Sequence, residues 1–436
     1  MNSRLAPRTS RLPVCRPVRV LSDVHLRDAA PHIDDPALVA IFEDLAGQAP
    51  GRLVLNGDFF DFVKVTAVPG NPDEFERPVT PAERFYGLGT GEDRSAWKAA
   101  RILDANPRTV AALRDLVASG HEIVFLPGNH DAEVRYPAVR AEIAARIDPA
   151  GSGALSFPAW FYHEPGRLWV EHGSQYDREN VFPDFGSTES AAFGMPFGIV
   201  SSRYFANVIE RRCGLPPSDM GPGGYFVWVF RNHGLRAFAA IARYFVFAAI
   251  CLLGSGPFRR RRMGSPAAHK EALRGDAMRA GIDTAAAVKI DALKADPLLA
   301  SLGRTVLRLY LPQVSLTVAS WMVALAIAVF APGWWVAGVS LVAGSTAVLA
   351  LSGRIYTGQI RPRLEDAAGS IAAALDIPCV VFGHDHNGIR SRATPENFAS
   401  SVWRFGSGPA RILEIPPERP VPHVLLARSK LQEERT

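Results

Sequence analysis

The sequence predicts an α/β fold, and three observations support this prediction. Five segments share one layout, a short apolar run followed by a polar cluster. Short runs rich in Val, Ile, Leu and Phe are typical of buried strands. Helical patterns, "DPALVAIFEDLAG" and "NPRTVAALRDLVASG", separate the first three of these runs. Strands that alternate with helices define the α/β class.

The polar clusters follow the predicted strands in every case. In open α/β sheets, ligands bind beyond the carboxyl ends of the strands, so these clusters are candidate functional residues. The five segments are Val18–His25, Arg52–Asp61, Glu122–Asp131, Arg167–Gly173 and Cys379–His386.

Length and composition limit the alternatives. A chain of 436 residues accommodates two or three domains, or one large domain with an insertion. The net charge of +5 favours contact with polyanions or anionic lipid headgroups. The four cysteines have no paired spacing, which argues against a disulfide framework or a zinc knuckle and fits a reducing compartment. The first twenty residues contain no apolar signal region, so we expect the protein to start in the cytoplasm.

A long uncharged stretch separates the fourth and fifth segments. No charged residue occurs in the 45 positions from Leu309 to Gly353. Within it, Val314–Phe330 and Trp334–Leu351 are apolar runs of 17 and 18 residues joined by "APG". Both approach the length that crosses a bilayer, so we expect a membrane hairpin. The alternative is a buried hairpin in the core of a large soluble domain.

A shorter apolar run, Phe238–Leu253, precedes the hairpin and contains Arg243. An arginine at the centre of a membrane helix costs roughly 2.5–3.5 kcal/mol on insertion scales. Because "RRRR" follows at 259–262, the run is more typical of an interfacial amphipathic helix than of a span. The sequence leaves open whether it enters the membrane.

The polar clusters contain metal-binding side chains. Asp23 and His25 are two positions apart, as are His384 and His386, and this spacing points both side chains of a strand the same way. Further donors follow other strands, namely Asp58 in "NGD", Asn129 and His130 in "GNHD", and His172 in "EHG". Carboxylate, imidazole and carboxamide ligands suit Mn, Fe, Zn or Mg. Singly, each motif is more often a turn or a hydrogen-bonded polar residue.

The order D-x-H, GD-x-x-D, GNHD, HG, GHDH resembles the calcineurin-like metallophosphoesterase superfamily. The likeness covers Val18–Gly173 and the chain from Cys379 onward. It implies a β-sandwich of two sheets flanked by helices and two divalent metal ions, with manganese expected and iron, zinc or magnesium as alternatives. The first ion would be held by Asp23, His25, Asp58 and His386. The second would be held by Asp58, Asn129, His172 and His384, so that Asp58 bridges the two.

The resemblance also implies a reaction. Two divalent ions about 3.5–4 Å apart activate a water and clamp the oxygens of an in-line displacement at phosphorus. His130 would not be a ligand; it would stabilise the developing charge and protonate the leaving group. Asp61 would orient His130, although a purely loop-stabilising role is the alternative. Asp131 and Asp385 would support the ligands.

The position of the hairpin constrains its topology. His172 and His384 would share one ion, so both lie on the same side of any membrane and the chain crosses it an even number of times. Basic residues flank the hairpin on that side, including Arg304, Arg308 and Arg354. The positive-inside rule therefore predicts an inner-membrane protein with a cytoplasmic active site. We expect a first part of the catalytic domain at 1–185, a helical lid and membrane hairpin at 186–363, and the second part at 364–436.

An enzyme held against a lipid bilayer has access to lipid phosphates. Within the superfamily, the sequence is most similar to UDP-2,3-diacylglucosamine pyrophosphatases, whose HGD-containing loop resembles "EHGSQYD". The sequence differs from those enzymes at two positions. Ser174 stands where they usually have an acidic residue after HG, and His130 stands where many of them have arginine. We therefore expect a lipid-linked phosphodiester or pyrophosphate substrate. Nucleotides, phospholipids and a non-catalytic scaffold are alternatives, and no nucleic-acid partner is expected because no aromatic-basic platform is visible.

Overall fold

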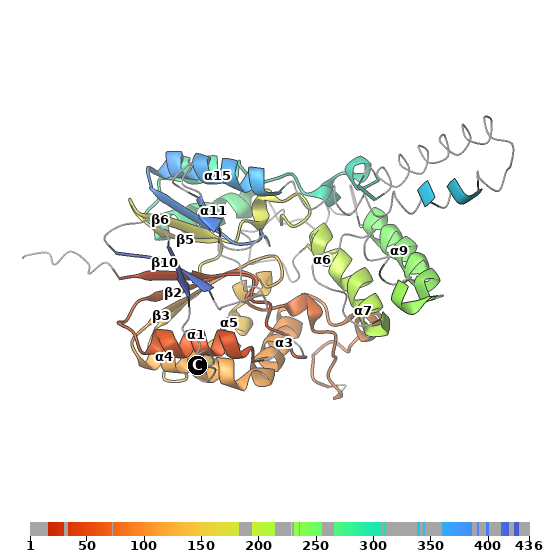
Figure 1. The fold of residues 1–436 in the computed structure, drawn as a ribbon, viewed down its shortest axis with the longest axis horizontal. Helices are drawn as coiled ribbons and strands as arrows, with labels where there is room; N and C mark the ends of the chain where they lie inside the picture. The colour runs from red at the N-terminus through yellow and green to blue at the C-terminus, as the bar shows by residue number, and fades with distance from the viewer. Residues whose placement is uncertain are drawn as a thin grey trace, which may run out of the picture.

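The structure is a computed structural model of the whole chain (Figure 1). It describes residues 16–29, 34–71, 73–182, 194–213, 228, 231–234, 236–254, 266–306, 308–309, 338–340, 343–344, 360–385, 390–391, 398–400, 411–417 and 423–426.

Two β-sheets form the centre of the described structure. One has six strands in the order β11-β10-β1-β2-β3-β4, and the other has five in the order β5-β6-β7-β9-β8. The strands are β1 (Val18–Leu21), β2 (Arg52–Asn56), β3 (Glu122–Leu126), β4 (Leu155–Ser156), β5 (Phe161–Glu164), β6 (Leu168–Glu171), β7 (Cys379–Phe382), β8 (Arg390–Ser391), β9 (Phe398–Ser400), β10 (Arg411–Ile415) and β11 (His423–Leu426).

Each sheet combines strands from both ends of the chain. In the six-stranded sheet, β1, β2, β3 and β4 run parallel, whereas β10 pairs antiparallel with β1. In the other, β6 runs parallel to β7, and β7 runs parallel to β9. The five apolar runs recognised in the sequence are the strands β1, β2, β3, β6 and β7. With the helices described below, the predicted α/β class is confirmed.

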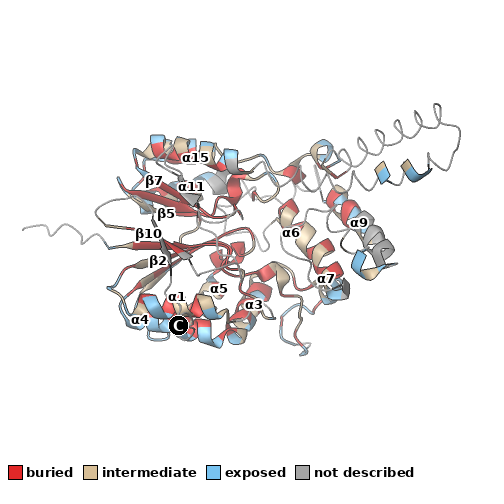
Figure 2. Cartoon of the chain, in the orientation of Figure 1, coloured by how far each residue is buried: buried red, intermediate tan, exposed pale blue. Residues whose placement is uncertain are grey.

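The two sheets pack against each other through apolar side chains. Val20 and Val54 of one sheet belong to the same buried cluster as Val170 and Val381 of the other. All four side chains are fully buried, and Figure 2 shows the buried residues concentrated along both sheets. Strands buried on both faces explain why the five runs are almost continuously apolar.

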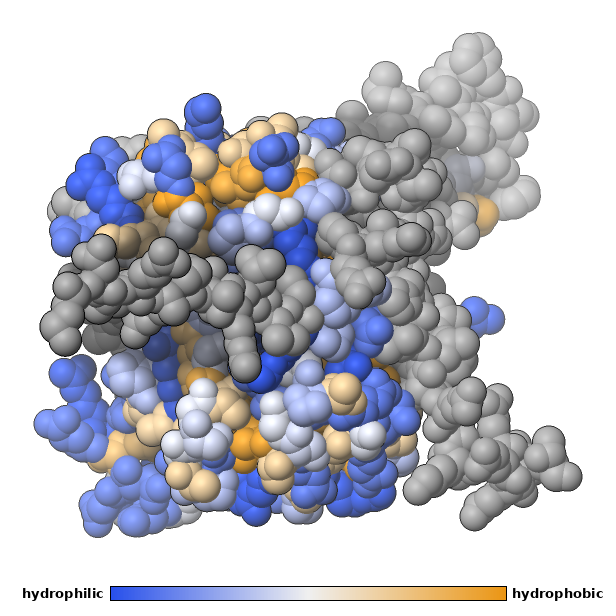
Figure 3. Space-filling model, turned by 90° about the vertical axis from the view of Figure 1, so that its left-hand side faces the viewer, coloured by the Kyte–Doolittle hydropathy of each residue, from blue (hydrophilic) through white to orange (hydrophobic). Residues whose placement is uncertain are grey.

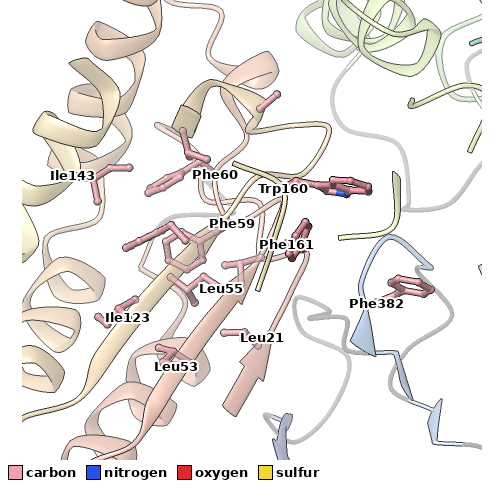
Figure 4. Packing of buried hydrophobic residues seen from close by; sticks show 14 of the residues in the cluster. Leu21, Leu53, Leu55, Phe59, Phe60, Ile123, Ile143, Trp160, Phe161 and Phe382 are labelled. Carbon is pink, nitrogen blue, oxygen red and sulfur yellow. The ribbon is translucent and has the colours of Figure 1, made fainter. Parts of the chain in front are cut away.

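Helices cover the outer faces of the sheets (Figure 1). One group lies beside the six-stranded sheet, and a second group lies beside the five-stranded sheet. The first group is α1 (Pro36–Ala46), α3 (Glu92–Ala105), α4 (Pro107–Ala118) and α5 (Pro137–Ile147), and the second includes α11 (Pro266–Arg279), α12 (Thr284–Asp291) and α15 (Ile360–Leu375). In Figure 4, Leu55, Phe59 and Ile123 gather on the side of the strands that faces Ile143 of α5.

The first helix illustrates how the sequence sets these elements. The Asp35 side chain accepts a hydrogen bond from the Ala37 N–H at 2.9 Å, and Pro36 occupies the first turn. Both features favour the start of a helix. The Asp35 carboxylate pairs with an N–H that would otherwise lack a partner, and proline has no N–H to leave unpaired. Leu38, Phe42 and their buried neighbours form the apolar stripe that packs on the sheet. The helices predicted at 35–47 and 106–120 are thus present as α1 and α4.

A smaller helical unit lies to one side of the sheets (Figure 1). It has its own buried cluster, which includes Phe205, Phe247 and Cys251. Its helices are α6 (Phe197–Ser201), α7 (Asn207–Cys213) and α9 (Arg236–Leu253), with a π-helical segment, η4 (Ser202–Ala206), between the first two. Short helices and turns of the chain elsewhere are α2 (Pro81–Tyr86), η1 (Phe62–Lys64), η2 (Ala132–Arg135), η3 (Ser174–Tyr176) and η5 (Leu298–Ala300).

The apolar run Phe238–Leu253 is helical and belongs to α9. The Arg243 guanidinium lies 4.8 Å from the ring centre of Phe85 and 5.0 Å from that of Tyr86, so it contacts the aromatic end of α2. The predicted hairpin, Val314–Leu351, lies outside the described residues except for 338–340 and 343–344. Within the described part of the chain, no helix combines the length and apolar character needed to cross a membrane.

The described surface is mixed in character. Figure 3 shows hydrophilic side chains over much of the lower part of one face, and hydrophobic side chains gathered at the level of α11 and α15. Met278 of α11 and Val288 of α12 are exposed apolar residues of this layer. Scattered exposed apolar side chains are ordinary on a protein surface.

Candidate metal centre

Asp58 lies at the centre of a cluster of polar side chains beyond the strand ends. It follows β2 directly after Gly57 and is 1% exposed. Its Oδ2 atom lies 3.3 Å from Nε2 of His172, which follows β6, and 3.9 Å from Nε2 of His25, which follows β1. The fold therefore brings three of the sequence-predicted metal ligands together at the edge where the strands end.

Two groups of side chains have the arrangement of metal sites. One contains His25, Asp58 and His130, and the other contains Asp58, His172 and His384. In each group, one ligand atom per residue lies within 4.8 Å of the others. Asp58 belongs to both groups, which is the position expected for a carboxylate that bridges two ions.

The ring of His172 is oriented by the main chain. Its Nδ1 lies 3.0 Å from the carbonyl oxygen of Asn56, and its Nε2 lies 3.1 Å from Oδ1 of Asn129. A carbonyl can only accept, so Nδ1 carries the proton. Nε2 faces two oxygen atoms, Oδ2 of Asp58 and Oδ1 of Asn129, so an ion bound beside these oxygens would take the place of the proton on Nε2.

His384 is oriented by a residue that sequence reasoning missed. Its Nε2 lies 3.1 Å from Oδ2 of Asp177. Its Nδ1 atom is buried and has no hydrogen-bond partner in the described part of the chain. A carboxylate on one ring nitrogen and an open second nitrogen are features of metal-binding histidines. Asp177 occurs in "EHGSQYD", five positions after His172, and this short spacing was its only signal in the sequence.

Asn129 is held by a second missed residue. Its Nδ2 donates to Oδ1 of Asn180 at 3.3 Å, while Nδ2 of Asn180 donates to Oδ2 of Asp177 at 2.7 Å. Because the amide nitrogen of Asn129 is engaged, its oxygen faces His172. No recurrent spacing in the sequence marks Asn180.

The backbone of these residues departs from the extended geometry that the D-x-H spacing predicted. The strand β1 ends at Leu21, and the φ angles of Asp23 and His25 are 59° and 55°. The Asp23 N–H donates to the Gly57 carbonyl at 3.1 Å, and the His25 N–H donates to the Asp58 carbonyl at 2.8 Å. Backbone bonds between two loops, rather than strand alternation, thus place these side chains.

Left-handed backbone recurs at the cluster. Asp58 has φ 52° and His384 has φ 61°, so four predicted ligands adopt a conformation that costs non-glycine residues about 1–3 kcal/mol each. Such strain persists where the surrounding structure enforces it, and it is concentrated at functional sites.

The remaining predicted ligands differ in their status. Oδ2 of Asp23 accepts the His384 N–H at 3.1 Å and also contacts the Ser22 hydroxyl, but Asp23 is in neither of the two groups described above. His386 lies outside the described residues. Of the four ligands predicted for the first site, only His25 and Asp58 lie in one of these groups. The third member of that group is His130, which was not predicted to be a ligand.

Asp61 connects several positive groups. Its Oδ1 lies 2.8 Å from Nδ1 of His130, and its Oδ2 lies 3.0 Å from Nη2 of Arg27 and 3.6 Å from Nδ1 of His25. The His25 and His130 rings meet edge to face with centroids 4.7 Å apart. Asp61 thus contacts His130, the residue that the family resemblance implied it would orient. It also faces His25, and nothing in the sequence indicated this second contact.

The electrostatics of the cluster favour positive charge. Burial by itself would raise the pKa of Asp58, but the charges of His172, His130 and His25 outweigh it and hold this pKa well below its usual range. Burial would lower the pKa of His172, yet the carboxylates of Asp58 and Asp23 raise it to about 10. A buried site that stabilises a proton so strongly is also suited to a cation.

Close packing leaves little freedom around Asp58. Asp131 accepts hydrogen bonds from the main-chain N–H groups of Gly128, Asp58, Phe59 and Phe60 at 2.6, 3.0, 2.8 and 3.2 Å. At Gly128, an added Cβ would lie 2.2 Å from Oδ1 of Asp58. Glycine is therefore required in "PGNHD", because any side chain there would displace the Asp58 carboxylate.

The donor set fits divalent metal ions. Carboxylate, amide and imidazole atoms converge on Asp58, two histidine rings are oriented through one of their nitrogens, and the cluster stabilises positive charge. Neither a protein-family model nor a curated protein matches this chain. The case for a metal centre therefore depends on its residues and their geometry.

Proposed function

We propose that this protein is a two-metal phosphoesterase that hydrolyses a phosphodiester or pyrophosphate bond. The observation that carries the proposal is the pair of potential metal sites that share Asp58. Asp23, His25, Asp58 and His386 would hold one ion, and Asp58, Asn129, His172 and His384 would hold the other. Two manganese ions, or other divalent ions, would polarise the phosphoryl group and activate water.

His130 is suited to act on the leaving group. Oδ1 of Asp61 lies 2.8 Å from its Nδ1, so its Nε2 is on the opposite side of the ring. The His130 side chain is 19% exposed, whereas Asp61 is fully buried. A partly exposed histidine that is fixed at one nitrogen can use the other to donate a hydrogen bond to a phosphoryl oxygen and deliver a proton to the departing oxygen.

The other side chains hold this arrangement in place. The Asn56 carbonyl and Asp177 orient the rings of His172 and His384, and Asp131 holds the loop that presents Asp58. Preorganised ligands of this kind reduce the reorganisation that substrate binding would otherwise require. The motif order of the calcineurin-like metallophosphoesterase superfamily supports the same chemistry.

We further propose that the substrate is lipid-linked and that the enzyme works at the cytoplasmic face of the inner membrane. The support is in the sequence: 45 consecutive uncharged residues, Leu309–Gly353, are inserted between two halves of the motif set. The resemblance to UDP-2,3-diacylglucosamine pyrophosphatases makes that glycolipid the first substrate to test. Hydrolysis of its pyrophosphate would release UMP.

The test is hydrolysis of UDP-2,3-diacylglucosamine by the detergent-purified full chain with Mn²⁺. The Asp58→Ala variant is assayed beside it, and Asp115→Ala, which removes an exposed carboxylate of α4, is the matched control. Circular dichroism checks that both variants fold. We expect UMP from the wild type and the control, and none above background from Asp58→Ala.

Two other results are informative. Metal-dependent cleavage of bis(p-nitrophenyl) phosphate without UMP release would keep the phosphoesterase class and reject this glycolipid. If folded, Mn²⁺-loaded protein shows neither activity, the proposed function is overturned.

A further inference from the structure

A short turn links two candidate ligands of the second metal site. We call residues 177–181 the bracing turn, since the main-chain N–H groups of Asn180 and Val181 both donate to the Asp177 carbonyl, at 3.0 and 2.8 Å. Asp177 contacts His384, and Asn180 contacts Asn129. A displacement of this one turn would therefore alter ligands that follow both β7 and β3.

The bracing turn is also attached to the helical region that follows it in the chain. The Leu298 N–H donates to the Arg178 carbonyl at 2.8 Å, and the Gly198 N–H donates to the Glu179 carbonyl at 2.9 Å. The packing at Gly198 is tight, because an added Cβ would lie 2.1 Å from Oδ1 of Asn180. The turn is thus enclosed between the metal ligands on one side and the 194–309 region on the other.

One ion pair joins this region to the turn through side chains. Nε of Arg308 donates to Oε1 of Glu179. The Glu179 side chain is 13% exposed and that of Arg308 is 23% exposed, and the guanidinium lies 5.8 Å from the ring centre of Phe197. An ion pair shielded in this way is held more firmly than a solvent-exposed one.

We propose that Arg308 is a positioning residue for the second metal site. Through Glu179 it holds the bracing turn, and the turn holds His384 and Asn129 in the orientation that ligation requires. The inference rests on the proposed metal centre. Arg308 is also the last charged residue before the uncharged stretch that starts at Leu309. The proposal thus gives a role to the point where this stretch begins.

The expected effect is moderate. Loss of a direct hydrogen-bond partner of a metal ligand costs about 10–100-fold in metal affinity. Arg308 acts one residue further out, so we expect Arg308→Leu to weaken Mn²⁺ binding at the second site by roughly 3–10-fold, the low end of that range or below it. The first site should lose less affinity, because the contacts of the turn described above reach His384 and Asn129, which we assign to the second site.

The experiment measures Mn²⁺ binding to the full chain by equilibrium dialysis. Arg304→Leu is the matched control, because Arg304 lies four positions earlier in the chain and its Nη1 pairs with the exposed Asp296 at 3.0 Å. Glu179→Gln removes the same ion pair from its other side. Thermal unfolding verifies that each variant is folded.

The proposal predicts that Arg308→Leu and Glu179→Gln weaken one of two Mn²⁺ sites to a similar extent, that the double variant loses little more, and that Arg304→Leu binds as wild type does. Should Arg308→Leu fail to fold, Arg308→Lys takes its place, since lysine keeps the charge but lacks the guanidinium fork. Affinities that are equal in the Arg308 and Arg304 variants would overturn the proposal.

Failure of this inference is distinguishable from failure of the proposed function. Two Mn²⁺ sites, one of them weakened by Arg308→Leu, in a protein that hydrolyses no phosphoester would support the positioning role and reject the activity. If the enzyme is active but Arg308→Leu and Arg304→Leu bind Mn²⁺ equally well, the activity is supported and the positioning role is rejected. A wild type that binds no Mn²⁺ would overturn both.

Discussion

Oδ1 of Asp61 lies 2.8 Å from Nδ1 of His130, and Asp61 is completely buried. Burial alone would lower the pKa of His130, but the charges of Asp61 and Asp58 raise it above its ordinary value. The contact thus favours both the orientation and the protonated state that a proton donor requires. This contact supports the orienting role that we propose for Asp61.

His130→Gln is expected to lower kcat by about 10²–10⁴-fold, the usual contribution of a general acid. Because His130 is not among the ligands that we assign to either ion, Mn²⁺ affinity should remain near that of the wild type. Steady-state kinetics on the substrate that proves active, together with equilibrium dialysis, measures both quantities. A loss of Mn²⁺ affinity as large as the loss of kcat would make His130 a ligand of the group it forms with His25 and Asp58.

Mn²⁺ should stabilise the folded chain through Asp58. A ligand that binds only the native state at about 100 times its Kd adds about 2.7 kcal/mol to the free energy of unfolding. We expect this gain for the wild type in denaturant titrations with and without Mn²⁺, and its reversal by a chelator. Asp58→Asn should lose most of the gain, because both sites share this residue. A full gain in that variant would contradict a bridging role.

Gly128→Ala should be strongly destabilising and should weaken Mn²⁺ binding. The added Cβ would lie 2.5 Å from the Asp58 nitrogen as well as 2.2 Å from its Oδ1. Both atoms are held by hydrogen bonds, the nitrogen to Asp131 and Oδ1 to the His130 N–H. Overpacking of this kind costs about 1–3 kcal/mol. The control is Gly369→Ala, where no atom lies within 4 Å of the new Cβ. In the middle of α15 this control should be neutral or stabilising by up to about 1 kcal/mol. Chemical denaturation compares the two.

Mild acid should destabilise the fold partly through His121, which is far from the metal centre along β3. The Gly51 N–H donates to its Nδ1 at 3.1 Å, and burial, with Arg19 nearby, lowers its pKa below the ordinary value of 6.5. The unfolded chain therefore takes up this proton first. The stabilisation is complete above pH 6.5 and is lost as the pH falls below that value.

The measurement for His121 is the melting temperature of wild type and His121→Asn between pH 8 and pH 5.5. The asparagine oxygen can accept the Gly51 N–H without titrating. The wild type should lose more stability on acidification than the variant does. Parallel pH profiles would show that His121 contributes nothing to the acid sensitivity.

Much of the site was predictable because its residues follow strands. Apolar runs identify β1, β2, β3, β6 and β7, and parallel strands bring whatever follows them to one edge. His25, Asp58, His172 and His384 meet there for that reason. The two-residue spacing of Asp23 and His25 correctly pointed to the site, but the expected strand geometry was wrong. Both residues have left-handed backbone and lie beyond the end of β1.

By itself, the sequence determined the α/β class, the strand and helix periodicity and the candidate ligands, because these depend on local pattern and on residue chemistry. Only the tertiary structure decided which groups orient the histidine rings, that Asp177 and Asn180 support His384 and Asn129, and that Arg308 reaches Glu179. Those contacts join residues as far apart as 207 positions, as in the pair of Asp177 and His384. Long-range pairs leave no periodic signal in one sequence, since the chain path between them is set by the packing of the sheets.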